Sequence, residues 1–304
     1  TVKRTRKDIK SSKLKPHAAE KPSAPLPAVS DEHVAYLRRL KRHNRFIIAM
    51  QLAILVAFIG LWQLFGDLGI VNTFIASSPL RVLKTLARLN ASGELFVHIG
   101  VTMLETIAGF TVGTLVGTLI AVLMWWSKTL SRILDPYMVV LNALPKIALG
   151  PIIIVWVGAG MEAIIVMALL ISTIVTIMTV LAGFNEISAE KQLLMRTLGA
   201  NKMQTFLKVI LPASVPTIIG ALKLSVGMSW VGVIVGEYLV SKSGLGYLIV
   251  YGGQVFQLDL VMTSIVILCI LAALMYYCIA FLEKRILQAR VTSLKVRSSY
   301  RSFT

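Results

Sequence analysis

Runs of about 20 apolar residues follow one another along this sequence, and they constrain the fold more than any other feature. As an α-helix, each run is long enough to cross the hydrocarbon core of a membrane. A soluble all-helical core is the nearest alternative, but a soluble domain rarely holds several such runs, and 56% of the 304 residues are hydrophobic. The sequence therefore predicts an all-α polytopic membrane protein with six transmembrane helices. The six runs are residues 46–65, 101–126, 136–157, 163–184, 216–240 and 261–282.

The third run is interrupted by Pro145 and again by Gly150–Pro151. Proline removes a backbone donor and bends a helix. Each half of the run alone is too short to cross roughly 30 Å of hydrocarbon. We therefore expect the two halves to form one kinked span.

The distribution of Lys and Arg predicts the orientation, because basic residues accumulate in the cytoplasmic loops of membrane proteins. With the N-terminus in the cytoplasm, the cytoplasmic segments hold 25 of the 31 Lys and Arg residues. Both termini are therefore predicted to be cytoplasmic. A net charge of +17 also raises the question of nucleic-acid binding. The basic residues flank membrane spans, however, so anchoring to membrane lipid at the cytoplasmic surface accounts for them better.

Composition divides the chain into four parts. Residues 1–45 form a basic cytoplasmic tail, in which residues 1–32 are rich in Lys, Ser and Pro and are predicted to be disordered. Residues 33–45 are predicted to be either a short basic helix on the membrane surface or a solvated charge run. The remaining parts are the first span with an outer loop (46–95), a membrane core (96–283) and a second basic cytoplasmic tail (284–304).

The longest predicted cytoplasmic loop between spans, residues 185–215, has the pattern of two short helices joined by a turn. Glu190 to Leu198 can form the first helix. Gly199 can end it with a positive φ, where a side chain would cost energy. Asn201 is a good N-cap for the second helix, and Gln204 three residues later completes a capping-box pair.

An apolar stripe follows at helical spacing, formed by Met203, Phe206 and Ile210. A plain connection between spans does not need such a stripe, whereas docking into the groove of a partner does. Pro212 and Pro216 would set the entry into the fifth span, because proline is tolerated in the first turn of a helix.

The spacing of this loop resembles the EAA loop of ABC importer permeases. The pattern runs from Gly199–Ala200 through Phe206 and Val209 to Leu211–Pro212 and Pro216. In that family the loop forms a coupling helix that sits in a cleft of the ATP-binding subunit. The resemblance therefore implies coupling roles for Gly199, Ala200, Phe206, Leu211 and Pro212.

The chain departs from the family pattern just upstream of this glycine. Where the family has Glu-Ala-Ala, this sequence has Leu193, Leu194 and Met195. Glu190, about one turn earlier, is the candidate replacement for the family's glutamate in contacts with the ATP-binding subunit.

Three further stretches are similar to the sulfonate, taurine and nitrate branch of these permeases: Ser77 to Leu104, Asn142 to Gly158 and Val235 to Ile249. The resemblance implies a type I importer permease fold with cytoplasmic coupling helices, in which residues 96–283 are the permease core. It also implies a separate subunit that binds ATP and Mg²⁺, an extracytoplasmic substrate-binding protein and a second copy of this chain. The solute would be a sulfonate, taurine or nitrate-like anion, or a thiamine-precursor pyrimidine.

Charged residues within the predicted spans are candidates for the transport pathway, because a charge in the membrane is costly unless it serves a function or has a partner. Lys146 and Lys223 would attract small anions. The sequence leaves open the alternative that they pair with a carboxylate or extend to the membrane surface. Glu105 and Glu237 are predicted near the outer ends of their spans. The pathway candidates are Asn142, Lys146, Lys223 and Glu237.

Small residues recur every four positions in the second span, and a shorter pair occurs in the fifth span. Faces of this kind let helices approach closely, so we expect packing within the subunit or across a dimer rather than contact with substrate. These residues are Gly109, Gly113, Gly117 and Ala121 in the second span, and Gly232 and Gly236 in the fifth.

The sequence contains no GxxxxGK[ST] phosphate loop, no metal-ligand spacing and no nucleophile–base motif. We therefore expect no catalytic residue, no metal and no cofactor in this chain, and any ATP hydrolysis must come from a partner. Two rival interpretations remain: a secondary transporter, which needs no ATPase, and an intramembrane enzyme, which needs a catalytic set.

Overall fold

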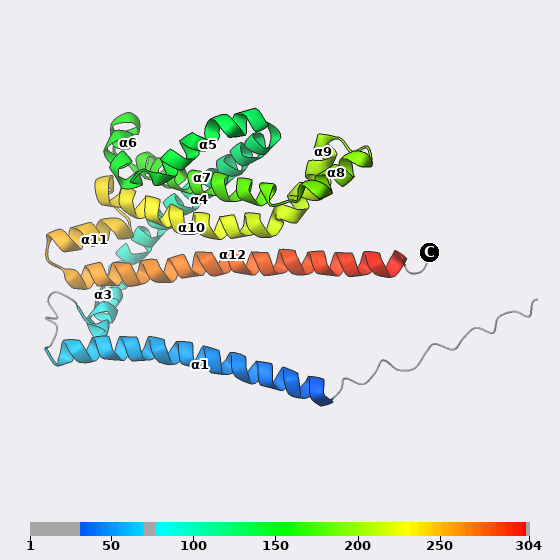
Figure 1. Cartoon of the computed structure of the whole chain (residues 1–304). Helices are drawn as coiled ribbons and strands as arrows, with labels where there is room; N and C mark the ends of the chain where they lie inside the picture. The colour runs from blue at the N-terminus through cyan, green and yellow to red at the C-terminus, as the bar shows by residue number, and fades with distance from the viewer. Residues whose placement is uncertain (1–30, 70–76, 302–304) are drawn as a thin grey trace, which may run out of the picture. The chain divides into compact units, whose positions relative to one another are not determined.

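The computed structural model describes residues 31–69 and 77–301, in which every regular element is a helix (Figure 1). The chain divides into two compact units, residues 1–60 and 61–304. In chain order the helices are α1 (Asp31–Asp67), α3 (Pro79–Ala91), α4 (Glu94–Trp126), α5 (Lys128–Ala143), the 3-10 helix η1 (Lys146–Leu149), α6 (Gly150–Val157), α7 (Met161–Asn185), α8 (Ala189–Thr197), α9 (Lys202–Thr205), the π-helix η2 (Phe206–Ile210), α10 (Leu211–Val240), α11 (Leu245–Gln254) and α12 (Leu258–Arg301).

Within the described ranges, five helical segments are long and apolar enough to cross a membrane. A sixth is present if the bent pair formed by α5 and η1–α6 counts as one span. The all-helical, six-span prediction agrees with this set. The five segments are Arg38–Asp67, Glu94–Trp126, Met161–Asn185, Lys202–Val240 and Leu258–Ile286.

The expected break in the third span lies at Pro145. The two helical parts meet there at 95°. Leu144, the residue before this proline, has an extended backbone, as sterics at an X-Pro bond favour. Gly150–Pro151 is not a second break, because it begins α6, where a proline in the first turn is tolerated.

The basic segment 33–45 is not a separate surface helix. Helix α1 begins at Asp31 and continues without interruption to Asp67, so this segment is the start of the same helix that contains the first span. The predicted disorder of residues 1–32 falls almost entirely outside the described residues. At the other end of the chain, α12 likewise continues beyond its apolar part to Arg301.

Helix α7 packs against both α4 and α10, and small residues set the distance between these helices. A Cβ atom added to Gly113 of α4 would lie 2.1 Å from Ser172 Oγ on α7, and one added to Gly232 of α10 would lie 2.5 Å from Ala168 Cα. At Gly232 the obstructing atoms belong to the backbone, so no side chain fits there, whereas a side chain at Gly113 would have to displace Ser172. The small-residue faces therefore pack within the subunit, which is one of the two alternatives, within the subunit or across a dimer, that the sequence left open.

Hydroxyl groups on α7 fasten the three helices together. The Thr173 hydroxyl donates to the carbonyl oxygen of Gly113 at 3.2 Å, and the hydroxyls of Thr176 and Ser225 lie 2.5 Å apart. In a membrane, hydrogen bonds of this kind hold helices together where burial of apolar surface contributes little.

Candidate functional site

The local geometry of the cytoplasmic loop agrees with its sequence signals. Gly199 follows α8 with φ +76°, in the left-handed region that favours glycine. Asn201 then caps α9: the Gln204 N–H donates to Asn201 Oδ1 at 2.8 Å. In return, the Asn201 N–H donates to Gln204 Oε1 at 3.0 Å, which completes the capping box.

The second helix of the loop does not end before the fifth span. Helices α9, η2 and α10 form one uninterrupted segment from Lys202 to Val240. Pro212 lies in the first turn of α10 and Pro216 lies inside it, and neither breaks the helix. The helix that contains the fifth span therefore begins inside the loop at Lys202, well before residue 216, where the span was predicted to start.

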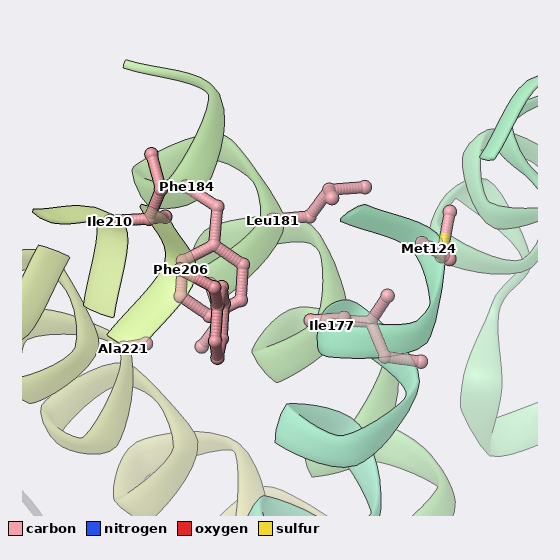
Figure 2. Close-up of a cluster of buried hydrophobic side chains, with 9 residues drawn as sticks. Met124, Ile177, Leu181, Phe184, Phe206, Ile210 and Ala221 are labelled. Carbon is pink, nitrogen blue, oxygen red and sulfur yellow. The ribbon is translucent and has the colours of Figure 1, made fainter. Parts of the chain in front are cut away.

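The expected stripe of Met203, Phe206 and Ile210 is split between two faces, which corrects the sequence prediction. Phe206 and Ile210 are buried in an apolar cluster with residues of α4, α7 and α10, as Figure 2 shows. The Phe206 ring centroid lies 4.9 Å from that of Trp125 and 5.6 Å from that of Phe184. Met203 is exposed. Contact with these neighbouring rings, rather than with solvent, fixes the direction in which Phe206 points.

A different set of apolar side chains faces outward from the loop. Leu194 and Leu198 expose 59% and 73% of their surface. Leu194 occupies one of the three positions where the family pattern has Glu-Ala-Ala, and Leu198 lies three residues beyond them. The replacement is visible in the sequence, whereas the exposure of these side chains is visible only in the structure. We call this set the exposed loop face; it consists of Leu193, Leu194, Leu198, Met203 and Leu207.

The remaining coupling candidates lie around this face and the cluster. Glu190 is exposed in the first turn of α8. Ala200 and Pro212 are half-buried, and Leu211 packs at the edge of the apolar cluster.

Lys202 fastens the start of α9 to the end of α4. Its ammonium group donates to the carbonyl oxygen of Trp126, the last residue of α4. The same group lies 5.6 Å and 5.2 Å from the ring centroids of Trp125 and Trp126, in cation–π geometry. A lysine here also complements the negative end of the α4 dipole.

The structure places the two lysine candidates of the pathway in different settings. Lys223 of α10 forms an ion pair with Glu283 of α12, which favours the pairing interpretation that the sequence left open. Lys146 lies at the bend between α5 and α6 and donates to the backbone oxygen of Asn142 at 2.9 Å. Asn142 and Lys146, both pathway candidates, therefore lie together at the bend.

Glu237 is buried and holds the chain that follows α10. Its carboxylate accepts from the Thr102 hydroxyl of α4 at 2.6 Å and from the Gly246 N–H at the start of α11 at 2.5 Å. The Thr102 oxygen in turn accepts from the Leu245 N–H at 2.8 Å. A Cβ atom at position 246 would lie 2.8 Å from the Glu237 carboxylate, so a side chain there would displace this carboxylate. The environment of Glu237 is that of a structural anchor.

Comparison with known proteins finds a family whose model matches this chain. A family model described as the binding-protein-dependent transport system inner membrane component matches residues 113–293. The aliphatic sulfonates transport permease protein SsuC of Bacillus subtilis (strain 168) is 31% identical over 232 residues, which are 76% of this chain and 84% of that protein. The taurine transport system permease protein TauC of Escherichia coli K12 is 23% identical over 244 residues, 79% of this chain and 89% of that protein.

A solved structure shares the fold. An inward-facing conformation of the MetNI methionine ABC transporter superposes with a TM-score of 0.51 and 24% sequence identity, and the match covers 65% of this chain and 94% of that chain. The importer permease fold that the loop suggested is thereby confirmed.

Proposed function

The chain belongs to the family of binding-protein-dependent transport inner membrane components, and from this premise we propose that a separate ATP-binding subunit drives it through the loop of α8 and α9. It is a multi-pass inner membrane protein and the membrane-spanning permease subunit of an ABC importer. Members of this family carry no ATPase domain of their own. ATP and Mg²⁺ would be bound by the partner, and the exposed loop face would be the surface that docks into it.

One observation carries this proposal: the loop exposes apolar side chains, and its second helix, α9, runs without a break into α10. Leu194 and Leu198 expose apolar surface that a partner's groove would bury. Phe206, at the end of α9, packs between the rings of Trp125 and Phe184. A displacement of the docked loop would therefore be transmitted through α10 directly and to α4 and α7 through this ring.

The loop and both termini are proposed to lie in the cytoplasm, in accord with the excess of basic residues in these segments. The substrate-binding protein would then dock on the opposite side, where α3 and α11 lie near the other ends of the spans. A second copy of the chain would complete the pathway.

A small organic or inorganic anion is the proposed solute, with sulfonates and taurine foremost because relatives carry these names. Lys146 is the pathway candidate that supports an anion. No Asp or Glu pairs with it in the described part of the chain, whereas Lys223 is neutralised by Glu283. Nitrate and thiamine-precursor pyrimidines are the other outcomes, and the ligand retained by the cognate binding protein would decide among them.

Docking is tested by placing a charge on the exposed loop face. The double variant Leu194→Asp/Leu198→Asp should lose the ATP-binding subunit during co-purification in detergent, because two carboxylates would be buried in an apolar groove without partners. Leu83→Asp is the matched control, since Leu83 is similarly exposed but lies on α3 at the other end of the membrane core.

Both variants should insert into the membrane and elute as monodisperse species. Retention of the ATP-binding subunit by the double variant, at the level of wild type and of Leu83→Asp, would show that this face does not dock.

A further inference from the structure

A pocket of about 530 Å³ lies beside the loop, between the ends of the membrane helices and the two short helices α8 and α9. Four basic side chains line it, and no Asp or Glu does. Amide side chains of Asn185 and Gln192 complete its polar wall. The basic residues are Lys128, Arg132, Arg196 and Lys202.

The four cations come from three different elements, so the fold gathers them. Lys128 and Arg132 lie one turn apart on α5, Arg196 lies in the last turn of α8, and Lys202 begins α9. Neither of the two ion pairs found in the described ranges involves any of them; Lys202 donates to the Trp126 carbonyl oxygen, which leaves its positive charge without a carboxylate partner. Four cations around one pocket repel one another, and an anion bound between them would remove that repulsion.

The start of α5 adds to the positive potential of the pocket. Lys128 is the first residue of this 16-residue helix, so the positive end of the helix dipole lies at the pocket wall. The Ser127 hydroxyl oxygen already caps the helix by accepting from the Leu130 N–H at 3.2 Å. The dipole is thus a second contribution beside the side-chain charges.

We infer that this pocket binds a tetrahedral oxyanion, with the chemistry of sulfate, a sulfonate or a phosphate group. Arginine guanidinium groups match such oxygens bidentately, and lysine ammonium groups add point charge. A pocket of this volume can hold the anion together with water. Because its walls belong to α5 on one side and to α8 and α9 on the other, a bound anion would join the loop to the membrane core.

A small anion fits this pocket better than a segment of the ATP-binding subunit. The pocket is lined on α8 by Gln192 and Arg196, whereas Leu194 and Leu198 of the exposed loop face do not line it. The surface proposed for docking and the cationic pocket therefore use different sides of the same helix. The anion site does not depend on which solute is transported.

The test is binding of radiolabelled sulfate to the full-length protein in nanodiscs of neutral phosphatidylcholine. Wild type should bind sulfate saturably, and the affinity should fall with added chloride. Arg132→Gln/Arg196→Gln should weaken binding about tenfold or more, because two charge-assisted contacts are lost. Lys191→Gln/Lys208→Gln removes the same charge from exposed positions of the same loop outside the pocket, and should bind within about twofold of wild type.

Amide hydrogen exchange over residues 189–205 provides a second readout. It responds only if the bound anion links the loop to the membrane core. Sulfate should slow exchange there in wild type and in Lys191→Gln/Lys208→Gln, but not in the pocket variant. Nanodiscs containing phosphatidylglycerol separate the two sources of the anion. Displacement of sulfate by this lipid would assign the site to a headgroup, and unchanged sulfate binding would assign it to a soluble anion; both support an oxyanion site.

The inference fails if wild type and the pocket variant bind sulfate equally, or if neither binds it in neutral lipid. It also fails if the ATP-binding subunit abolishes sulfate binding and Arg132→Gln/Arg196→Gln weakens that subunit's association, since the pocket would then receive the subunit itself.

Discussion

Replacing Gly232 with alanine should force α10 away from α7. A Cβ atom at this position would lie 2.5 Å from Ala168 Cα and 3.0 Å from its nitrogen. Both are backbone atoms, so no rotamer change can relieve the overlap. Carbon atoms in contact normally lie about 3.5–4.0 Å apart, so the helices must separate locally by roughly 1 Å.

The cost follows from the contacts that such a separation loses. A gap of roughly 0.5–1 Å forfeits about a quarter to a half of the dispersion energy of each pair it opens, and overpacking in a close-packed interior costs about 1–3 kcal/mol. Alanine also gains up to about 1 kcal/mol over glycine in a helix through backbone entropy. Gly227→Ala is the matched control in the same helix, because nothing lies within 4 Å of a Cβ atom there.

Comparison of the two variants isolates the packing term, since the gain from alanine is common to both. The free energy of unfolding, measured by titrating helicity with sodium dodecyl sulfate in detergent micelles, should be unchanged or raised by up to about 1 kcal/mol in Gly227→Ala. Gly232→Ala should be less stable than this control by about 1–3 kcal/mol. Equal free energies of unfolding would refute close packing of α10 against α7 at this position.

Two further predictions concern the loop and the buried Glu237. Asn201→Ala should speed amide hydrogen exchange in α9 and cost about 0.5–2 kcal/mol by removing the N-cap, whereas Asn201→Asp, which retains a capping oxygen, should preserve protection; equal exchange in both would contradict the capping role. Glu237→Ala should lower the free energy of unfolding by about 2–4 kcal/mol, because the Thr102 hydroxyl and the Gly246 N–H lose a buried acceptor. The same change at exposed Glu162 should cost less than about 0.5 kcal/mol, and a similar loss at both sites would rule out the anchor.

Local features of the sequence were sufficient to predict the membrane spans and the capping of the loop. Apolar runs long enough to cross a membrane identify the spans, because a chain in lipid must satisfy its backbone within the segment. Gly199 and Asn201 act through their own backbone and nearest neighbours, so their roles can be read without knowledge of the fold.

Features that depend on contacts between distant segments were missed or misassigned. The direction of Phe206 is set by Trp125 of α4, which lies 81 positions away in the sequence, and helical spacing alone cannot tell a docking face from a buried face. Glu237 was predicted only as a pathway candidate, and its hydrogen bonds with the Thr102 hydroxyl and the Gly246 N–H could not be anticipated from the sequence. The cationic pocket could not be predicted from the sequence, because the residues that line it come from separate helices.

The dependence of transport on a separate ATPase is tested most directly by uptake into proteoliposomes that contain this chain, its binding protein and a radiolabelled sulfonate. With the ATP-binding subunit and ATP present, the solute should accumulate. Without that subunit, uptake should be absent even when a proton or sodium gradient is imposed. Gradient-driven accumulation by the chain in the absence of the ATP-binding subunit would contradict the coupling mechanism and identify a secondary transporter.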